Sequence, residues 1–489
     1  MILRQTLKIL ALATLAGCSV GPTYKQPPAP TPIDWKNKVS NCDGKNAGEM
    51  VYLDYWWQVF EDPKLEELET IAVQNNRDIY AAYQRIQEAR AIMCISAGNL
   101  APQIFEQPQY TNTFELIKNY VNPQNTTIQN IPQSGQPFRA HELFYFWPLN
   151  LTWEIDLWGK LQDQVNSDKY RWQAQKKDYQ NIMLSLTSNL AIAYYQLRTL
   201  DARIDLLKSV LVTRQKALEI NSARYEGQIV FYADVTLSEE EVQDAIIQYD
   251  EALRQRNVLE NQIAVLTGVP ASEVCLEHNP LSGLPPCIPS GIPSEVLLRR
   301  PDIAEAELFV RSDNELIKKA YALFYPSLIL TATGGFESPI FKDFIRWFSR
   351  YLMLGAQSNQ LVFDGFITEN NLYLQISRFK EASAQFQQQV LIAFQEVENA
   401  LGDIESYADQ YNSAVDTVQW AGKTYELYND RYKMGVIYYI NVVNTERDLL
   451  NFQILANSLQ GNRFVATIQL IKALGGGWDA VASTSECER

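Results

Sequence analysis

Apolar and polar side chains alternate strictly over one short stretch of the chain, residues 149–157. A period of two is that of a β-strand with one apolar and one polar face. The apolar positions are Leu149, Leu151, Trp153, Ile155 and Leu157. The polar positions are Asn150, Thr152, Glu154 and Asp156. The stretch predicts one amphipathic strand, although the patterns around it are helical.

Apolar residues spaced three and four apart fill the segment that follows. The stripe runs through Met183, Leu186, Leu190, Ala193, Leu197, Leu200, Ile204, Leu207 and Leu211. Every one of these positions is again apolar or aromatic 207 residues later. Such spacing is typical of a coiled-coil seam, and equally of a long bundle helix. A helix over 160–224 would be about 100 Å long at 1.5 Å per residue.

The shift of 207 belongs to an internal duplication. Tyr225 meets Tyr432 at this shift, whereas Asp78 meets Asp302 at a shift of 224, so one loop of the first half is longer. Each half reads as helix, strand, strand, long helix and returning helix. Strands are predicted over 103–114, 143–158, 327–336 and 351–363. The two repeats are predicted to span 63–280 and 301–478, joined by a linker over 281–300.

The N-terminus has the composition of a bacterial export signal. Arg4 and Lys8 precede a short apolar stretch that ends in Leu-Ala-Gly-Cys at Cys18, which resembles the lipobox of bacterial lipoproteins. We therefore predict a signal peptide over 1–17, lipidation of Cys18, a lipid-anchored segment over 18–62 and a C-terminal tail over 479–489. An ordinary signal peptide with a chance cysteine is the alternative. In lipoproteins, a residue other than Asp after the cysteine, here Ser19, favours the outer membrane.

Composition narrows the possible functions. The formal net charge is −15 and no basic run is present, which argues against a nucleic-acid partner. No nucleophile elbow, phosphate loop or zinc-binding spacing occurs, so the sequence predicts no enzyme, cofactor or metal site. Cys275 and Cys287 flank a loop rich in Pro and Gly and could form a disulfide, although isolated thiols fit equally well.

The four predicted strands have a length that suits a membrane. A tilted membrane strand needs roughly 9–11 residues, and an unpaired strand edge cannot face lipid. Because the smallest membrane barrels have about eight strands, several chains would have to contribute to one barrel. The apolar face of 149–157 would then contact lipid and the polar face would line the lumen. Aromatic clusters before two of the strands fit a membrane interface, but a buried soluble sheet would also use them.

Five stretches in order resemble the bacterial outer-membrane efflux channels, the TolC-like family with its lipidated branch. They are WWQVFEDPKLEELETIAVQNNRDIYAAYQRIQEAR from Trp56, RRPDIAEAE from Arg299, YPSL from Tyr325, LVFDG from Leu361 and RYKMG from Arg431. The resemblance implies a mainly α fold with membrane β structure. A homotrimer would close a twelve-stranded β-barrel, continued by a long periplasmic α-helical barrel.

The resemblance also implies a function. The protein would be a passive exit duct in the outer membrane for small molecules or drugs, with a periplasmic adaptor and an inner-membrane pump as partners. Two alternatives stay open: a protein-secretion duct of the same fold, and a periplasmic coiled-coil scaffold lipoprotein.

In this family the periplasmic gate forms where the last long helices turn, and rings of aspartate commonly lie there. The matching positions carry Asn441 and Asn444, followed by Arg447, and the repeat partner of Asn441 is Asp234. Neutral amides make a charged selectivity ring doubtful, and Arg447 could instead pair with Glu446 or Asp448. The family's adaptor-docking surface corresponds to Gly227, Gly435 and Val436, and both glycines would permit a tight reversal. Ordinary solvated turn residues are the alternative.

Overall fold

The computed structural model describes residues 20–37, 55–117, 138–288 and 299–476. They form two compact units. The first contains the described residues of 1–25, 89–171 and 310–381, and the second those of 26–88, 172–309 and 382–489. Each unit contains segments of both predicted repeats, so the boundary between the two compact units is not the boundary between the repeats. The bounds of the repeats therefore stay predictions. Cys18 and the predicted signal peptide lie outside the described residues.

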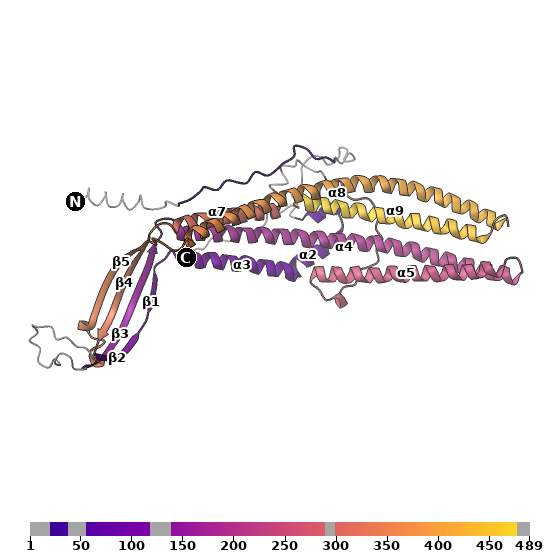
Figure 1. The fold of residues 1–489 in the computed structure, drawn as a ribbon. Coiled ribbons are helices and arrows are strands. Elements are labelled where there is room, and N and C mark those ends of the chain that lie inside the picture. The colour runs from indigo at the N-terminus through magenta and orange to yellow at the C-terminus, as the bar shows by residue number, and fades with distance from the viewer. Residues whose placement is uncertain (1–19, 38–54, 118–137, 289–298, 477–489) are drawn as a thin grey trace, which may run out of the picture. The chain divides into compact units, whose positions relative to one another are not determined.

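The first unit contains an antiparallel sheet (Figure 1). Its strands are β1 (Gln103–Glu106), β2 (Gln109–Ile117), β3 (Phe138–Ile155), β4 (Ser327–Ser338) and β5 (Arg350–Asn359). The order is β1-β3-β4-β5, and β2 also pairs with β3. Because β1 and β2 pair with successive parts of β3, they occupy one position, and the sheet is four strands wide. The four predicted strands are confirmed with shifted ends.

The register of β3 on β4 confirms the two faces predicted for this strand. Asn150 lies opposite Thr333 and Thr152 opposite Thr331, and the Thr333 hydroxyl donates to Asn150 Oδ1 at 3.1 Å. Leu149 faces Gly334 on the other surface. Polar residues of two strands therefore share one face, as cross-strand pairing requires. Which face meets lipid remains a prediction.

The strand ends earlier than predicted, at Ile155, so Asp156 and Leu157 are not strand residues. The Asp156 carboxylate accepts a bond from the backbone N–H of Gln162 at 2.7 Å, in the first turn of α4 (Lys160–Glu226). A carboxylate there satisfies an unpaired N–H and favours the positive end of the helix dipole. Asp156 thus serves the helix start, which corrects its assignment to the polar strand face.

The helices reproduce the duplication in their lengths. α3 (Arg77–Gly98) and α7 (Pro301–Ala322) each have 22 residues. α4 and α8 (Ile367–Lys433) each have 67 residues, and their bounds differ by the predicted shift. α5 (Tyr232–Thr267) and α9 (Tyr439–Ala473) are the returning helices. No helix among the described residues is long and apolar enough to cross a membrane.

The core of the second unit lies where short N-terminal elements meet the long helices. Trp56 and Trp57 of a 3-10 helix (Trp56–Phe60) and Leu65 of α2 (Pro63–Asn75) pack with the buried stripe of α4. Asp62 caps α2 by accepting from the N–H groups of Lys64 and Leu65. The stripe from Met183 to Leu207 is buried, which confirms its predicted role as a packing seam.

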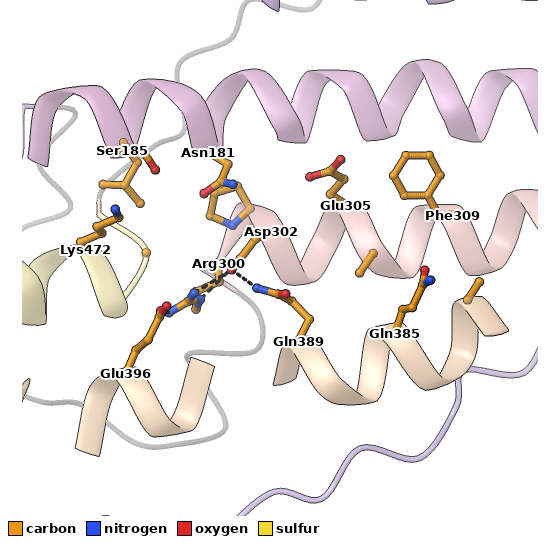
Figure 2. A pocket seen from close by; sticks show the side chains of 15 residues that line it. Asn181, Ser185, Arg300, Asp302, Glu305, Phe309, Gln385, Gln389, Glu396 and Lys472 are labelled. Carbon is orange, nitrogen blue, oxygen red and sulfur yellow. Dashed lines mark hydrogen bonds and ion pairs between the residues drawn. The ribbon is translucent and has the colours of Figure 1, made fainter. Parts of the chain in front are cut away.

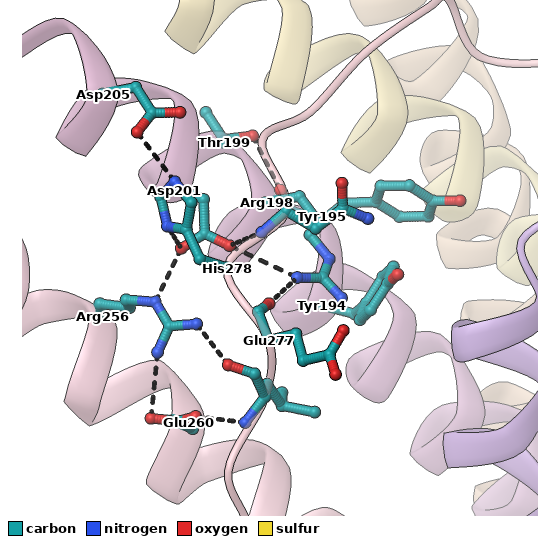
Figure 3. A network of polar contacts seen from close by, with 12 residues as sticks. Tyr194, Tyr195, Arg198, Thr199, Asp201, Asp205, Arg256, Glu260, Glu277 and His278 are labelled. Atoms are coloured by element: carbon teal, nitrogen blue, oxygen red, sulfur yellow. Dashed lines mark hydrogen bonds and ion pairs between the residues drawn. The ribbon is translucent and has the colours of Figure 1, made fainter.

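The connection after α5, which includes a 3-10 helix (Ala271–Glu273), is held on α4 and α5 by a buried carboxylate (Figure 3). Asp201 accepts from Arg256 Nε at 2.7 Å and from the Asn279 N–H at 3.0 Å. Arg198 donates to the Glu277 carbonyl at 2.7 Å.

This connection also decides the disulfide that the sequence left open. Cys275 is free and exposed, whereas Cys287 is bonded to a different cysteine. The pairing of Cys275 with Cys287 is therefore wrong. Closeness in sequence does not ensure the geometry that a disulfide requires, because the contacts of the loop decide where its cysteine side chains point.

Candidate functional site

Two short turns join the long helices of the second unit to their returning helices, α4 to α5 and α8 to α9. In the second turn Gly435 has φ 76°, and its N–H donates to the Tyr432 carbonyl at 2.9 Å. In the first turn the left-handed residue is Gln228, with φ 60°, and its N–H donates to the Tyr225 carbonyl at 2.9 Å. Gln228 is the repeat partner of Gly435. Gly227 has no left-handed φ, so its predicted role in the reversal is wrong.

Both turns carry exposed apolar side chains, as a docking surface requires. They are Ile229, Phe231, Tyr232, Met434, Val436 and Tyr438. A side chain added at Gly435 would meet nothing within 4 Å, so the turn is open on that side. In each turn the flanking tyrosines are in contact, with ring centroids 5.4 Å apart in the first and 5.3 Å apart in the second.

The gate candidates lie at the starts of the returning helices. Asn441 is half-buried, and its Nδ2 donates to the Tyr438 carbonyl at 3.3 Å. Asn444 is exposed one turn later on α9. Asp234 is half-buried in the first turn of α5, where a carboxylate favours the helix start. Asn444 therefore has its amide in solvent, while Asn441 also serves the backbone of its own helix.

Arg447 forms its ion pair with a residue that the sequence interpretation did not consider. Its Nη2 contacts the carboxylate of Glu241 on α5, which is 1% exposed. The alternatives Glu446 and Asp448 do not pair with it. Arg214 of α4, only 2% exposed, contacts the same carboxylate at 3.0 Å and also Asp244 at 3.1 Å. Three helices thus meet at Glu241.

The charges of the ion-paired groups in this cluster balance. Two guanidinium groups, of Arg214 and Arg447, face two carboxylates, of Glu241 and Asp244. Burial raises the pKa of the adjacent Glu446 carboxyl, and the charge of Glu241 raises it further, while Arg214 lowers it. A buried pair stabilises only while both partners are present, because removing one leaves an uncompensated charge. The cluster is therefore a junction sensitive to any change of charge.

A neutral network lies closer to the turns. The Tyr432 hydroxyl donates to Asn221 Oδ1 at 2.9 Å, and Asn221 Nδ2 donates to Ser238 Oγ at 2.8 Å. Asn221 is 1% exposed and belongs to α4, whereas Tyr432 is on α8. Burial raises the pKa of nearby Tyr439 to about 12. This network joins one helical hairpin to the other.

The sequence contained a signal for these missed residues. The stripe of α4 continues past Leu211 at the same spacing to Arg214 and Asn221. A charged or amide side chain inside an apolar seam must find polar partners when it is buried. The residue 207 positions after Arg214 is Ala421, which is apolar. The break in only one repeat marks the ionic junction.

A second polar site in the same unit surrounds a cavity of about 460 Å³ lined by α4, α7, α8 and the end of α9 (Figure 2). The buried Arg300 contacts Asp302 at 2.6 Å and Glu396 at 2.6 Å, and donates to the Ala473 carbonyl. Gln389 donates to Asp302 at 2.6 Å. Because these partners satisfy one another, the site holds the start of α7 in place. Among the described residues no group of His, Cys, Asp or Glu could hold a metal ion.

Known proteins resemble the chain over nearly its whole length. The toluene efflux pump outer membrane protein TtgF of Pseudomonas putida is 27% identical, covering 98% of each chain. The probable outer membrane lipoprotein SilC of Salmonella typhimurium is 26% identical, covering 96% of this chain and 99% of its own. The solved CmeC outer membrane channel of Campylobacter jejuni is 25% identical, with a TM-score of 0.85 over 96% of this chain and 97% of that one.

The fold, with its membrane-length strands and paired long helices, is that of an outer-membrane channel. The model of the outer membrane efflux protein family matches residues 125–269 and 292–476. The chain therefore belongs to the outer membrane efflux protein family, and it is an efflux channel of the outer membrane.

Proposed function

We propose that three copies of the chain form the exit duct of a tripartite efflux system, whose other parts are a periplasmic adaptor and an inner-membrane pump. The duct conducts small molecules passively to the outside. One observation carries the trimer: the sheet is four strands wide, and among the described residues β5 and the β1–β2 position each pair on one side only. Unpaired edges are costly in lipid, and three copies would supply twelve strands.

The substrate class rests on the relatives. Their names describe toluene and antibiotic efflux pumps, which export small molecules, and this favours a small-molecule duct over a protein-secretion duct. The lipid anchor at Cys18 belongs to the same proposal, as does the helical-turn surface around Gly435 and Val436 for the adaptor.

Planar-bilayer conductance of the purified protein tests the duct. We expect stable ion conductance from a species with three times the mass of the chain in detergent. A protein that leaves the membrane without detergent and never conducts would instead be a periplasmic scaffold. Cysteines placed at facing edges, one in β5 and one in β1, should cross-link between copies. Cross-linking within one copy only would exclude the trimeric barrel.

A further inference from the structure

The connection between β4 and β5, residues 340–350, presents an exposed apolar surface. Phe341, Ile345, Trp347 and Phe348 are 72%, 64%, 77% and 70% exposed. The connection lies at one end of the sheet, because Phe336 pairs with Arg350 there. α7 and α8 join the same two strands at the other end.

The exposed side chains are held outward by an ordered backbone. Two 3-10 helices, Phe341–Asp343 and Trp347–Ser349, form the connection. Tyr145 of β3 contacts the rings of Phe341 and Phe344, with centroids 5.4 and 5.9 Å away. The buried Ser349 hydroxyl donates to the Asp343 carbonyl at 2.6 Å. With Ser349 directed inward, the neighbouring aromatic rings stay in solvent.

Cations accompany the exposed rings. Within 340–350 the basic residues are Lys342, Arg346 and Arg350, and the only acid is Asp343, which pairs with Arg346 at 3.2 Å. Arg350 lies over the Trp347 ring at 2.8 Å, and Arg346 lies 5.8 Å from the Phe348 ring. The connection is therefore positive, although the net charge of the whole chain is −15. A local positive surface of this kind attracts anionic partners.

We propose that the connection over 340–350 binds a phosphate-bearing lipid of the outer leaflet, a docking surface that rests on the proposed outer-membrane duct. Aromatic side chains at the end of a membrane strand prefer the headgroup level, where apolar rings and polar edges are both satisfied. Arg350 over the Trp347 ring donates its Nε–H to the Trp347 carbonyl at 2.7 Å, and its terminal N–H groups can bind a phosphate. The boundary between lipid headgroups and hydrocarbon receives the rings of Phe341, Trp347 and Phe348. The phosphate is bound by Lys342, Arg346 and Arg350.

The test compares vesicles of phosphatidylcholine alone with vesicles that also contain bisphosphorylated lipid A or its dephosphorylated form. The full-length channel is reconstituted, and bound glycolipid is measured after purification in detergent. We expect selective retention of the phosphorylated form. The double variant Lys342→Gln/Arg346→Gln should lose it by about 25-fold, since each cation near an anionic surface contributes roughly a factor of five. Lys423→Gln is the matched control, because this lysine lies over the exposed Trp420 on α8.

Quenching by brominated lipid tests the rings. Trp347→Phe should remove a large part of the quenched fluorescence, whereas Trp420→Phe should not. Equal retention of both glycolipid forms, or equal losses in the double variant and the Lys423→Gln control, would overturn the proposal while conductance persists. Dissociation of the trimer in the double variant would also overturn it, because the surface would then join copies of the chain. Failure of the wild type to conduct would refute the duct itself.

Discussion

Gln228 and Gly435 occupy the same left-handed backbone position in the two helical turns, with φ of 60° and 76°. Only glycine adopts this conformation without steric cost, which for other residues is about 1–2 kcal/mol. Gln228→Gly should therefore slow hydrogen exchange of the first-turn amides by about fivefold, and Gly435→Ala should speed exchange in the second turn by a similar factor. Gly227→Ala is the control and should have little effect, because an added carbon there meets no atom closer than 3.6 Å.

The ionic junction at Glu241 gives a prediction for stability and for the gate. Arg214→Met removes the buried cation that faces the Glu241 carboxylate and should cost about 3–5 kcal/mol of unfolding free energy. It should also raise the conductance, because α4 loses its contact with Glu241, while the ion pair with Arg447 still joins α5 to α9. Denaturant unfolding in detergent and single-channel recording measure the two effects.

An exposed ion pair on α5, the helix that carries Glu241, provides the control for the Arg214→Met experiment. Arg254 pairs with Glu251 at 2.7 Å, and its side chain is 64% exposed. Arg254→Gln should leave both stability and conductance close to the wild-type values, because solvent screens an exposed ion pair. Similar losses in both variants would mean that the Glu241 junction has no special role.

Stability should depend on pH through Glu305. Burial raises the pKa of this carboxyl to about 7, with Asp178 and Asp302 raising it and Arg85 lowering it. The folded chain keeps a proton that the unfolded chain releases above its ordinary pKa near 4.5, so this group's contribution to stability falls as the pH rises from about 4.5 to 7. Glu305→Gln should be more stable than the wild type at pH 8, by on the order of 1 kcal/mol after solvent screening.

The pH profile of thermal unfolding in detergent checks this prediction. The advantage of Glu305→Gln should vanish near pH 4. Asp178→Asn should move the midpoint of the wild-type profile to lower pH, because it removes a negative charge that raises the pKa of Glu305. A constant difference between Glu305→Gln and the wild type at every pH would contradict the role of ionisation.

Periodicity predicted most of the fold because burial imposes it. The alternation after Leu149 and the stripe from Met183 predicted a strand and a long helix that the structure confirms. The start of β3 was not predicted, since pairing with β2 decides it and the aromatic run Phe144–Trp147 places rings on both faces. The pattern of apolar and polar residues shows which side chains are buried, whereas the ends of a strand depend on the strands that pair with it.

The site was less predictable, for two physical reasons. Gly227 was chosen by residue type, although the repeat shift places Gln228 opposite Gly435, and backbone conformation follows position rather than composition. The pairing of Arg447 with Glu241 joins residues on two helices that are far apart in sequence. A single stripe cannot show which helix lies across from it.

Lipidation at Cys18 is tested by one substitution. Cys18→Ser should abolish incorporation of labelled palmitate, because the thiol is the attachment point. Cys275→Ser is the control, since Cys275 is a free, exposed thiol elsewhere in the chain, and its labelling should equal that of the wild type. Continued labelling of Cys18→Ser would show that the lipid is attached at another residue and would refute lipidation at Cys18.

Asn444→Asp tests whether the start of α9 faces the conduction pathway. The Asn444 side chain is exposed, and three copies around an axis would convert a neutral ring into a ring of three carboxylates. Such a ring attracts cations, so the reversal potential in a salt gradient should shift toward the cation equilibrium potential. Asn412→Asp adds the same charge at an exposed position on α8 and should shift it less. Equal shifts in both variants would show that total charge, rather than a ring at Asn444, controls selectivity.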